Sequence, residues 1–287
     1  MTIRPVRDSD LEAIVALVCE IDPIAAMTVA SLSAELSTLP GDRFVAEVEG
    51  EIVGWAPAFH RADGAVSFWI GILPELRRRG LGGELFAALS PQLEGVRSRG
   101  YADGEEGARF LATRGYAPAG QIHLAKLELA AAEPADAAIP GFRAVSLTEL
   151  LDRLPDVHRL YAAVRGDIPR EHPIAPVPYA EFVSEIEGGL FDADASVVVL
   201  DGDEPVALSF SMTDRENGRA DTDLTGTLAD HRGRGLARLA KSDSLRRLRG
   251  LGIHTVATAN DGTNEPIRAL NESLGFREVA VWTRYVR

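Results

Sequence analysis

Two short segments rich in arginine and glycine carry the clearest chemical signal in the chain. Residues 77–83 read Arg-Arg-Arg-Gly-Leu-Gly-Gly, and residues 232–237 read Arg-Gly-Arg-Gly-Leu-Ala. Each segment follows an apolar run expected as a strand and opens an amphipathic helix. Because glycine lets backbone N–H groups turn toward an anion, and a helix N-terminus adds partial positive charge, both segments suit a phosphate group. We therefore predict two binding loops for a pyrophosphate.

The sequence around the two loops makes the prediction of pyrophosphate binding more specific than either loop would alone. Their spacing differs from the phosphate loop of nucleotide hydrolases and from the dinucleotide-binding fingerprint. One short match is weak in a chain with 27 glycines, but two matches in the same strand–loop–helix setting are stronger. A second marker follows each loop, Phe-Leu-Ala-Thr-Arg-Gly-Tyr at residues 110–116 and Leu-Asn-Glu-Ser-Leu-Gly-Phe at residues 270–276.

Length, charge and cysteine content narrow the class of protein. A chain of 287 residues is long enough for two domains. The net charge of −13 argues against nucleic acid and anionic membranes as partners; it either favours a cationic substrate or only keeps the protein soluble. The single cysteine, Cys19, lies in an apolar run and is expected to be buried. With no signal peptide, no transmembrane stretch and no metal spacing among the histidines, we expect a cytoplasmic protein without a metal.

The order of expected elements occurs twice along the chain. Each copy runs strand, two helices, hairpin, strand, glycine loop, helix, strand, helix and strand. The first copy covers residues 1–130, residues 131–140 form an Ala- and Pro-rich linker, and residues 141–287 form the second copy. Repetition at a period of about 140 residues indicates a duplicated domain, because solenoid repeats are much shorter.

With these motifs in place, the chain resembles the GCN5-related N-acetyltransferase (GNAT) superfamily, in the tandem two-domain arrangement similar to mycothiol synthase. The resemblance implies an α/β (α+β) fold of two domains, each a mixed, mostly antiparallel sheet flanked by helices. It also implies that the fourth and fifth strands splay apart to admit acyl-CoA, whose pyrophosphate lies on the loop amides. The residues implied to bind acetyl-CoA or another acyl-CoA are Leu228, Arg232, Gly233, Arg234, Gly235, Leu236, Ala237, Asn264 and Asn271 in the second copy, and Leu73, Arg78, Arg79, Gly80, Leu81, Gly82 and Gly83 in the first.

The two copies differ beside their loops. Asn264 matches the asparagine with which the family contacts the pantetheine arm, whereas Gly104 stands at that place in the first copy. The strand expected at 253–259 is also more apolar than its counterpart at 96–101. We therefore predict that the second copy is catalytic, and that the first either binds CoA without turnover or is a vestigial scaffold.

The groups that would move protons are less regular than the loops. Family members often use a glutamate on the fourth strand and a tyrosine in the last helix, but Asn271 and Leu111 occupy the tyrosine position here. Neither side chain can serve as that acid. Asp223 is our candidate base, either facing the substrate or lying on the solvent side of its strand, and Tyr285 is a further catalytic candidate.

A proline-rich loop at residues 167–178 falls where the family contacts its acceptor. Asp167, Glu171 and His172 are our candidates for binding a cationic amine there, unless this is an ordinary surface loop. We expect a monomer or homodimer that transfers acetyl from acetyl-CoA to a primary amine of a small, antibiotic-like or biosynthetic molecule, by direct attack in a ternary complex. The alternatives are a non-catalytic acyl-CoA-binding or sensing protein, transfer of another acyl group, and O-acylation.

Overall fold

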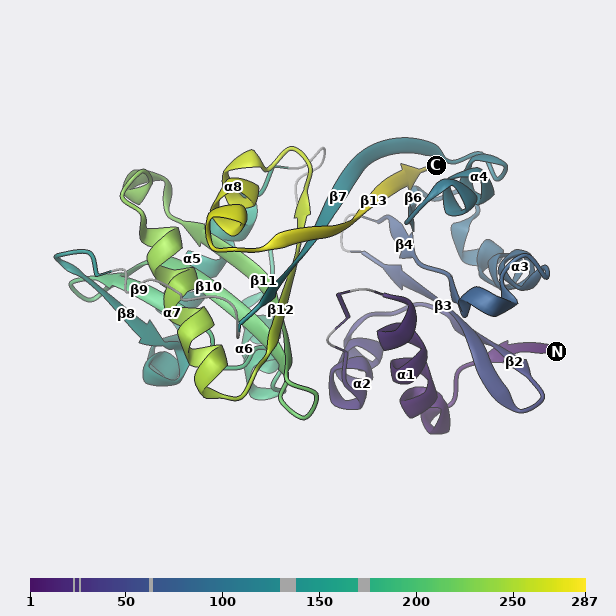
Figure 1. Cartoon of the computed structure of the whole chain (residues 1–287), viewed down its shortest axis with the longest axis horizontal. Coiled ribbons are helices and arrows are strands. Elements are labelled where there is room, and N and C mark those ends of the chain that lie inside the picture. Colours follow the sequence, from purple (N-terminus) through teal and green to yellow (C-terminus); the bar gives the residue numbers. More distant parts are fainter. Residues whose placement is uncertain (23, 26, 62–63, 130–137, 170–175) are drawn as a thin grey trace. The chain divides into compact units, whose positions relative to one another are not determined.

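The chain folds into two compact units. The computed structural model describes residues 1–287 except 23, 26, 62–63, 130–137 and 170–175. Unit 1 comprises Met1–Ile122 and Ala280–Arg287, and unit 2 comprises His123–Val279 (Figure 1). Within the described ranges, every helix is too short or too polar to cross a membrane.

Unit 1 is built on a sheet that is antiparallel from β1 to β4. β1 pairs with β2, β2 with β3 and β3 with β4, whereas β4 and β6 are parallel. The strands are β1 (Thr2–Pro5), β2 (Arg43–Val48), β3 (Glu51–His60), β4 (Val66–Phe68), β5 (Gly71–Ile72) and β6 (Ser98–Ala102). The helices are α1 (Leu11–Ile21), α2 (Val29–Thr38), α3 (Leu81–Leu93) and α4 (Glu105–Ala112), with short 3-10 turns η1 (Asp8–Asp10) and η2 (Pro74–Leu76).

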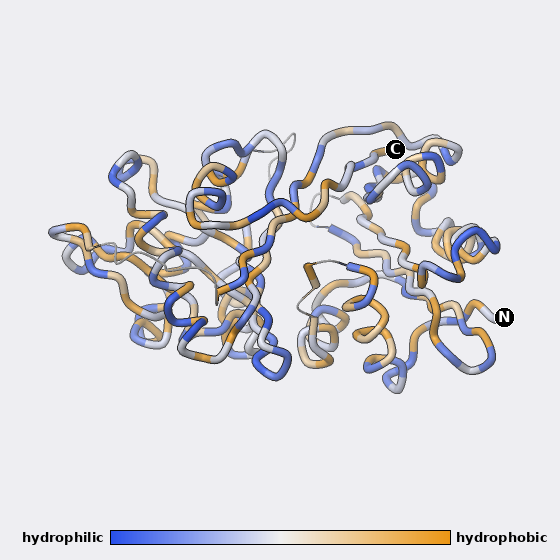
Figure 2. The backbone as a smooth tube through the Cα atoms, viewed as in Figure 1, coloured by the Kyte–Doolittle hydropathy of each residue, from blue (hydrophilic) through white to orange (hydrophobic). Residues whose placement is uncertain are grey.

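The core of unit 1 follows from the apolar spacing of its helices. In α3, Leu81, Leu85 and Leu89 recur every four residues and are buried with apolar residues of β3. In α1, Ile14 and Val18 have the same spacing and belong to a separate buried cluster. A stripe of this kind turns one face of a helix toward a sheet (Figure 2). Together the two clusters hold the strands that lead into the first glycine loop.

Unit 2 repeats this arrangement. β8 (Phe142–Ser146), β9 (Val197–Asp201), β10 (Glu204–Asp214) and β11 (Arg219–Thr227) are antiparallel neighbours, and β12 (Thr255–Asp261) is parallel to β11. The helices are α5 (Leu154–Gly166), α6 (Tyr179–Glu187), α7 (Leu236–Gly250) and α8 (Glu265–Ser273), with 3-10 turns η3 (Leu147–Arg153) and η4 (Ala229–His231). Tyr161, Phe182 and Phe210 form a ring cluster with centroids 5.0–6.4 Å apart, which fixes α5 and α6 on β10.

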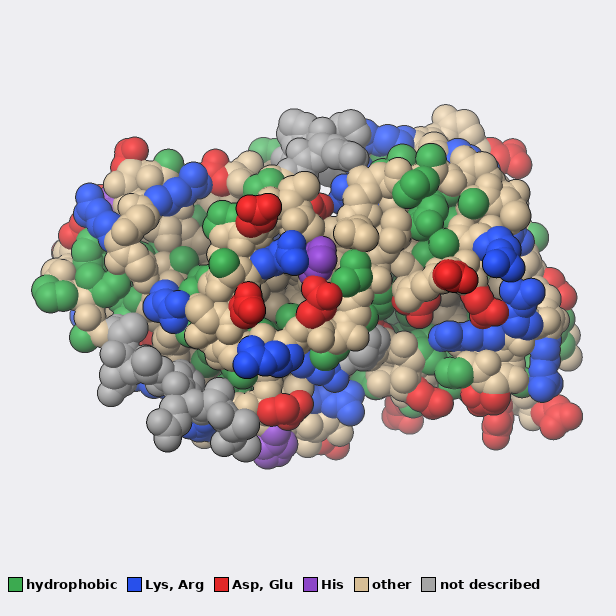
Figure 3. Space-filling view, turned by 45° about the horizontal axis from the view of Figure 1, so that its top comes forward, with side chains coloured by type: hydrophobic (Ala, Val, Ile, Leu, Met, Phe, Trp, Pro, Cys, Tyr) green, Lys and Arg blue, Asp and Glu red, His purple; other side chains and the backbone are tan. Residues whose placement is uncertain are grey.

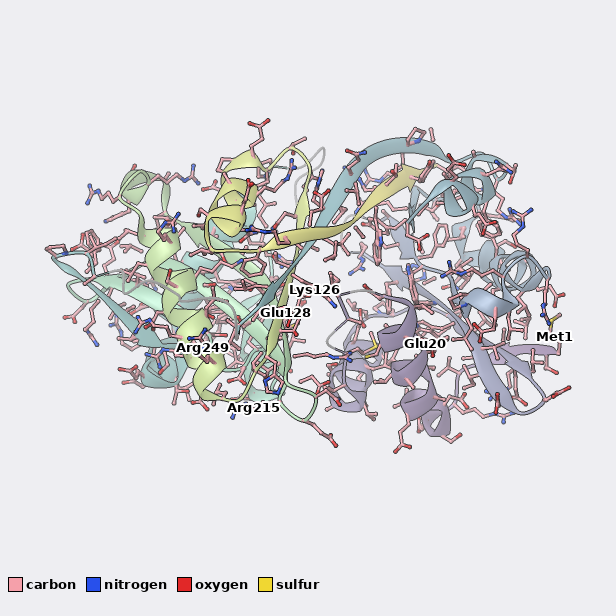
Figure 4. The ribbon with its side chains drawn as sticks, in the orientation of Figure 1. Met1, Glu20, Lys126, Glu128, Arg215 and Arg249 are labelled. Atoms are coloured by element: carbon pink, nitrogen blue, oxygen red, sulfur yellow. The ribbon has the colours of Figure 1, made fainter. Side chains whose placement is uncertain are left out.

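Two strands pass from one unit to the other, so unit 1 is made of two segments of the sequence and unit 2 of the one segment between them. β7 (Ala117–Glu128) ends in unit 2, where the Glu128 carboxylate accepts a hydrogen bond from Thr255 Oγ1 at 3.1 Å (Figure 4). β13 (Arg277–Val286) ends in unit 1, where Tyr285 lies opposite Gly100 of β6. The boundaries 1–130 and 141–287 remain a prediction about the duplicated segments. Most of the predicted linker, residues 131–137, lies outside the described residues.

Candidate functional site

Each glycine loop begins with an arginine that closes the turn. Arg77 donates from Nε to the carbonyl of Ile72 at 3.1 Å, and Arg232 donates from Nε to the carbonyl of Thr227 at 3.4 Å. The predicted loop covers residues 77–83, but the CoA contacts named within it did not include Arg77. Aligning the two repeats on Leu73 and Leu228, which precede the loops, would have identified it.

The backbone of both loops has the form expected of an anion-binding turn. Gly80 and Gly235 precede α3 and α7 with φ of 91° and 80°, a region that favours glycine. The second positive φ in each loop falls on Arg78 (65°) and Gly233 (75°). Among the described atoms, none lies within 4 Å of a Cβ built on Gly80 or Gly233, whereas Ile139 Cδ1 lies 3.6 Å from one built on Gly235. The loop residues therefore fit a pyrophosphate held by helix N-terminal amides and arginine.

In both units the strands beside the loop separate. β11 and β12 pair from Arg219–Thr255 to Asp221–Ala257, and the strands then continue to Thr227 and Asp261 beyond the last of these pairs. In unit 1 the parallel register of β4 and β6 runs only from Val66–Ser98 to Ser67–Arg99. Because the strands are parallel, both openings lie at their carboxyl ends, next to the glycine loops.

Unit 1 has a pocket of about 490 Å³ beside its loop. Such a volume is in the range of small-molecule sites. The indole Nε1 of Trp282, a lining residue from β13, is buried without a hydrogen-bond partner in the described structure. Figure 3 shows basic side chains interspersed with acidic ones on this unit. The lining includes loop glycines, aromatic rings and arginines: Gly80, Gly82, Gly83, Phe68, Trp69, Tyr101, Phe110, Arg77, Arg78, Arg109 and Arg114.

A stacked arginine stiffens one wall of this pocket. The guanidinium of Arg114 lies 3.6 Å from the ring centroid of Phe110 and 5.1 Å from that of Phe86. Its Nη1 also donates to the carbonyl of Phe110 at 2.9 Å. Burial lowers the pKa of Arg114, yet an arginine stays charged over the physiological range. The wall therefore presents a fixed positive charge beside an apolar surface.

Unit 2 contains a buried polar chain that joins α7, α8 and β12. Lys241 is 1% exposed and donates from Nζ to Asn271 Oδ1 at 2.6 Å, and Asn271 donates from Nδ2 to Asn260 Oδ1 at 2.7 Å. Asn271 was predicted as a CoA contact, whereas Lys241 was missed. Its signal was its spacing, because positions 241, 245 and 248 share the buried face of α7.

The pKa of Lys241 in this polar chain is unusual for a lysine. Burial lowers the pKa of Lys241 to about 7, and the negative charge of Asp221 opposes that change. The Nζ atom also lies 4.6 Å from the centroid of the Phe276 ring. The amine therefore titrates near neutral pH.

Three carboxylates on α6 and β11, those of Glu181, Glu185 and Asp223, lie near one another in unit 2. The register of β10 moves from Phe210–Leu224 to Ser211–Thr222, which leaves Asp223 as the extra residue of a β-bulge. Burial raises the pKa of Glu185 to about 7, and the charges of Glu181 and Asp223 add to this effect.

Tyr161 and Arg165 border these carboxylates. Arg165 donates from Nη1 to the Tyr161 hydroxyl at 3.1 Å, and burial raises the pKa of that hydroxyl. Glu185 Oε2 and Arg165 Nε are buried without a hydrogen-bond partner in the part of the chain described. The predicted Asp223 therefore has ionisable neighbours on two helices, none of which was named from the sequence.

The other predicted residues are divided between several places. Asp167 forms an ion pair with Arg232, which ties the end of α5 to the second loop. Asn264 is the N-cap residue of α8, and its side chain makes no capping bond. Tyr285 lies in the core of unit 1 because β13 ends there, and its catalytic role stays a prediction. Glu171 and His172 lie outside the described residues.

Splayed parallel strands beside a glycine loop at a helix N-terminus define the GNAT class of acetyltransferase folds. Residues 15–116 match the family model described as "Acetyltransferase (GNAT) family". Two curated proteins named mycothiol acetyltransferase, from Pseudarthrobacter chlorophenolicus and Arthrobacter sp., are 23% and 24% identical over 234 residues, covering 79% of this chain and 71% of theirs.

Solved structures agree with this fold along the whole chain. A tandem GNAT protein from the clavulanic acid biosynthesis pathway has a TM-score of 0.75 at 21% identity, covering 100% of this chain and 98% of that one. A GCN5-related N-acetyltransferase from Sphaerobacter thermophilus also has a TM-score of 0.75, at 17% identity, covering 100% and 95%. The chain therefore has the fold of tandem GNAT proteins along its whole length, and residues 15–116 match the GNAT acetyltransferase family model.

Proposed function

We propose that unit 2 transfers an acyl group, most simply acetyl, from acyl-CoA to a primary amine of a small cationic molecule. The observation that carries the acceptor class is the group of carboxylates around the β11 bulge, where the charges of Glu181 and Asp223 both act on Glu185. Negative charge concentrated at the carboxyl end of the splayed strands attracts a cation and orients it. The net charge of −13 acts in the same direction at longer range.

The same carboxylates provide a place for the proton that the amine must lose. An amine attacks only when neutral, so an acceptor that arrives as an ammonium needs a base. Glu185, with a pKa of about 7, is ionised in part at neutral pH and suits that role. Asp223 would hold the cation, and Arg165 and Tyr161 would orient the pair.

Acyl-CoA would be held by the second loop and would supply the activated acyl group as a thioester. Arg232, Gly233 and Gly235 surround the open N-terminus of α7, where a pyrophosphate is favoured. The Leu228 N–H is already used, since it donates to the carbonyl of Val206 at 2.9 Å. We therefore place Leu228 beside the bound arm as an apolar contact.

We propose that unit 1 binds CoA without turnover. Its loop has the same backbone form, and the pocket of about 490 Å³ lies beside it. However, Leu111 takes the place of Asn271, and Phe86 takes the place of Lys241 at the sixth position of the helix. Neither apolar side chain can donate or accept a proton.

Calorimetry with CoA, followed by transfer from radiolabelled acetyl-CoA to a panel of diamines, aminosugars and basic amino acids, tests the proposal. We expect Asp223→Asn and Glu185→Gln to lower kcat/KM for a cationic amine by about 10²–10⁴-fold while leaving the Kd for CoA unchanged. Asp203→Asn, in the exposed hairpin turn of the same unit, is the matched control. A chain that binds no CoA would refute the proposal.

A second candidate is a non-catalytic acyl-CoA sensor, which the missing tyrosine in both helices favours. It predicts CoA binding with no transfer to any amine. The loops would contact only the CoA part, so other acyl groups and hydroxyl acceptors belong in the same panel. The cytoplasmic location and the monomeric or homodimeric state remain predictions.

A further inference from the structure

Lys241 is an exception among the basic residues of this chain. Lysine occurs at two positions only, 126 and 241, among 30 lysines and arginines. Lys241 is 1% exposed and lies in α7, the helix that packs on the sheet of unit 2. Arginine stays charged when buried, whereas a buried lysine can release its proton. A lysine at this position therefore allows a change of charge that the usual basic residue of the chain would not.

The amine of Lys241 lies near the point at which β11 and β12 begin to separate. Asp221, whose charge acts on Lys241, belongs to the last pair of β11 with β12. Asn260, at the other end of the polar chain, lies on β12 beyond that pair. Lys241 is also five residues into α7, about 8 Å along the helix axis from the glycine loop. The polar chain therefore spans the base of the opening in which the proposed function places acyl-CoA.

A purely structural role explains this arrangement poorly. Phe86 fills the equivalent helix position in unit 1, and Leu111 fills that of Asn271, so an apolar pair completes the same fold. Replacing a buried charged or polar group by apolar residues of similar volume is often neutral or stabilising. The ammonium has three donors, and its hydrogen bond to Asn271 uses one of them.

We propose that Lys241, held in place by Asn271, donates a proton to the sulfur of coenzyme A during acyl transfer. The inference rests on the proposed function of unit 2. The acceptor nitrogen bonds to the acyl carbon, the C–S bond breaks with its electron pair left on sulfur, and Lys241 supplies the proton that completes the thiol. The proton lost by the acceptor nitrogen passes to Glu185 and solvent, and Lys241 is reprotonated from solvent. The net change is one proton moved from nitrogen to sulfur.

The surroundings of Lys241 support this role. A general acid works best when its pKa lies near the working pH, and burial brings the pKa of Lys241 to about 7. From β11 it faces Asp221; from α8 and β12 the groups in its hydrogen-bonded chain are the neutral amides of Asn271 and Asn260. Asn271 thus stands where family members have the tyrosine, and it holds Lys241 by a hydrogen bond.

The small number of lysines makes a direct test possible. Protein labelled with [ε-¹³C]lysine should give two side-chain signals, and Lys126→Arg identifies the one from Lys241 (Figure 4 labels Lys126). Both are titrated by NMR in the full chain alone, with CoA and with desulfo-CoA, which lacks the thiol. We expect CoA, but not desulfo-CoA, to shift the apparent pKa of Lys241 by about 1–3 pH units, because a thiolate within about 4–6 Å favours the ammonium. The Lys126 signal is the internal reference.

The outcomes separate the two proposals. Identical Lys241 titrations in the CoA and desulfo-CoA complexes would overturn the role of Lys241 while leaving CoA binding intact. No response of any kind to CoA would overturn the proposed function itself. In turnover, Lys241→Met should lower kcat by about 10²–10⁴-fold with little change in the KM for acyl-CoA. An unchanged kcat would also overturn the role, and if this variant fails to fold, the titration of the wild-type chain still decides.

Discussion

Lys241→Met should be more stable than the wild type at low pH and less stable than the wild type at high pH. In the folded chain burial lowers the pKa of Lys241 to about 7, against an ordinary value of 10.5. Between these values the unfolded chain binds the proton more strongly than the folded one. The free energy of unfolding of the wild type therefore rises as the pH rises from about 7 to about 10.5. The stabilisation is complete above about 10.5 and is lost as the pH falls to about 7. Methionine has similar length and no charge, so the variant should lack this slope.

The magnitude follows from the two pKa values. At about 1.4 kcal/mol per pH unit, the window corresponds to about 5 kcal/mol of destabilisation of the wild type below pH 7. The variant loses one hydrogen bond and leaves the buried Asn271 Oδ1 unpaired, which costs about 1–3 kcal/mol. We therefore expect Lys241→Met to be more stable than the wild type by about 2–4 kcal/mol at pH 6. At pH 10.5 it should be less stable by about 1–3 kcal/mol.

Urea denaturation followed at several pH values between 6 and 10.5 measures this crossover. All three tryptophans, Trp55, Trp69 and Trp282, lie in unit 1, so their fluorescence reports that unit, whereas circular dichroism also follows unit 2. The change should appear in the transition seen by circular dichroism and not in the tryptophan signal. Lys126→Met removes the other lysine as a control and should keep the slope of the wild type. Equal slopes for Lys241→Met and the wild type would refute the reasoning.

Three further predictions test other parts of the two units. In the wild type, the raised pKa of Glu185 favours the protonated folded state, so stability falls as the pH rises from about 4.5 to about 7. Glu185→Gln should remove this loss of stability, which urea titrations at several pH values measure. Gly226→Ala would place a Cβ 2.3 Å from Val164 Cγ1 and should cost about 1–3 kcal/mol, which Val164→Ala should relieve in the double variant in thermal unfolding. Deleting residues 280–287 removes Tyr285 from the core of unit 1 and should lower the stability of that unit by about 3–5 kcal/mol, read from the urea midpoint of tryptophan fluorescence.

The local elements could be predicted because short-range spacing determines them. The second loop and α7 follow from an arginine–glycine run before an apolar stripe, and the structure starts that helix at Leu236, within the predicted segment. The destination of β13 could not be predicted, since pattern alone does not say which sheet a strand joins. Tyr285 therefore lies in unit 1, opposite Gly100 of β6, and its catalytic role stays a prediction.

The chemistry beside the loops was hidden for a different reason. Lys241 and Asn271 are 30 residues apart in the sequence, and only the packing of α7 beside α8 brings Nζ to 2.6 Å from Oδ1. Taken alone, Asn271 marks a lost tyrosine and points to an inactive protein. Taken with Lys241, it marks a site where a proton donor has moved from one helix to the next. The absence of a family residue is thus weak evidence for lost activity when the residue in its place holds another titratable group.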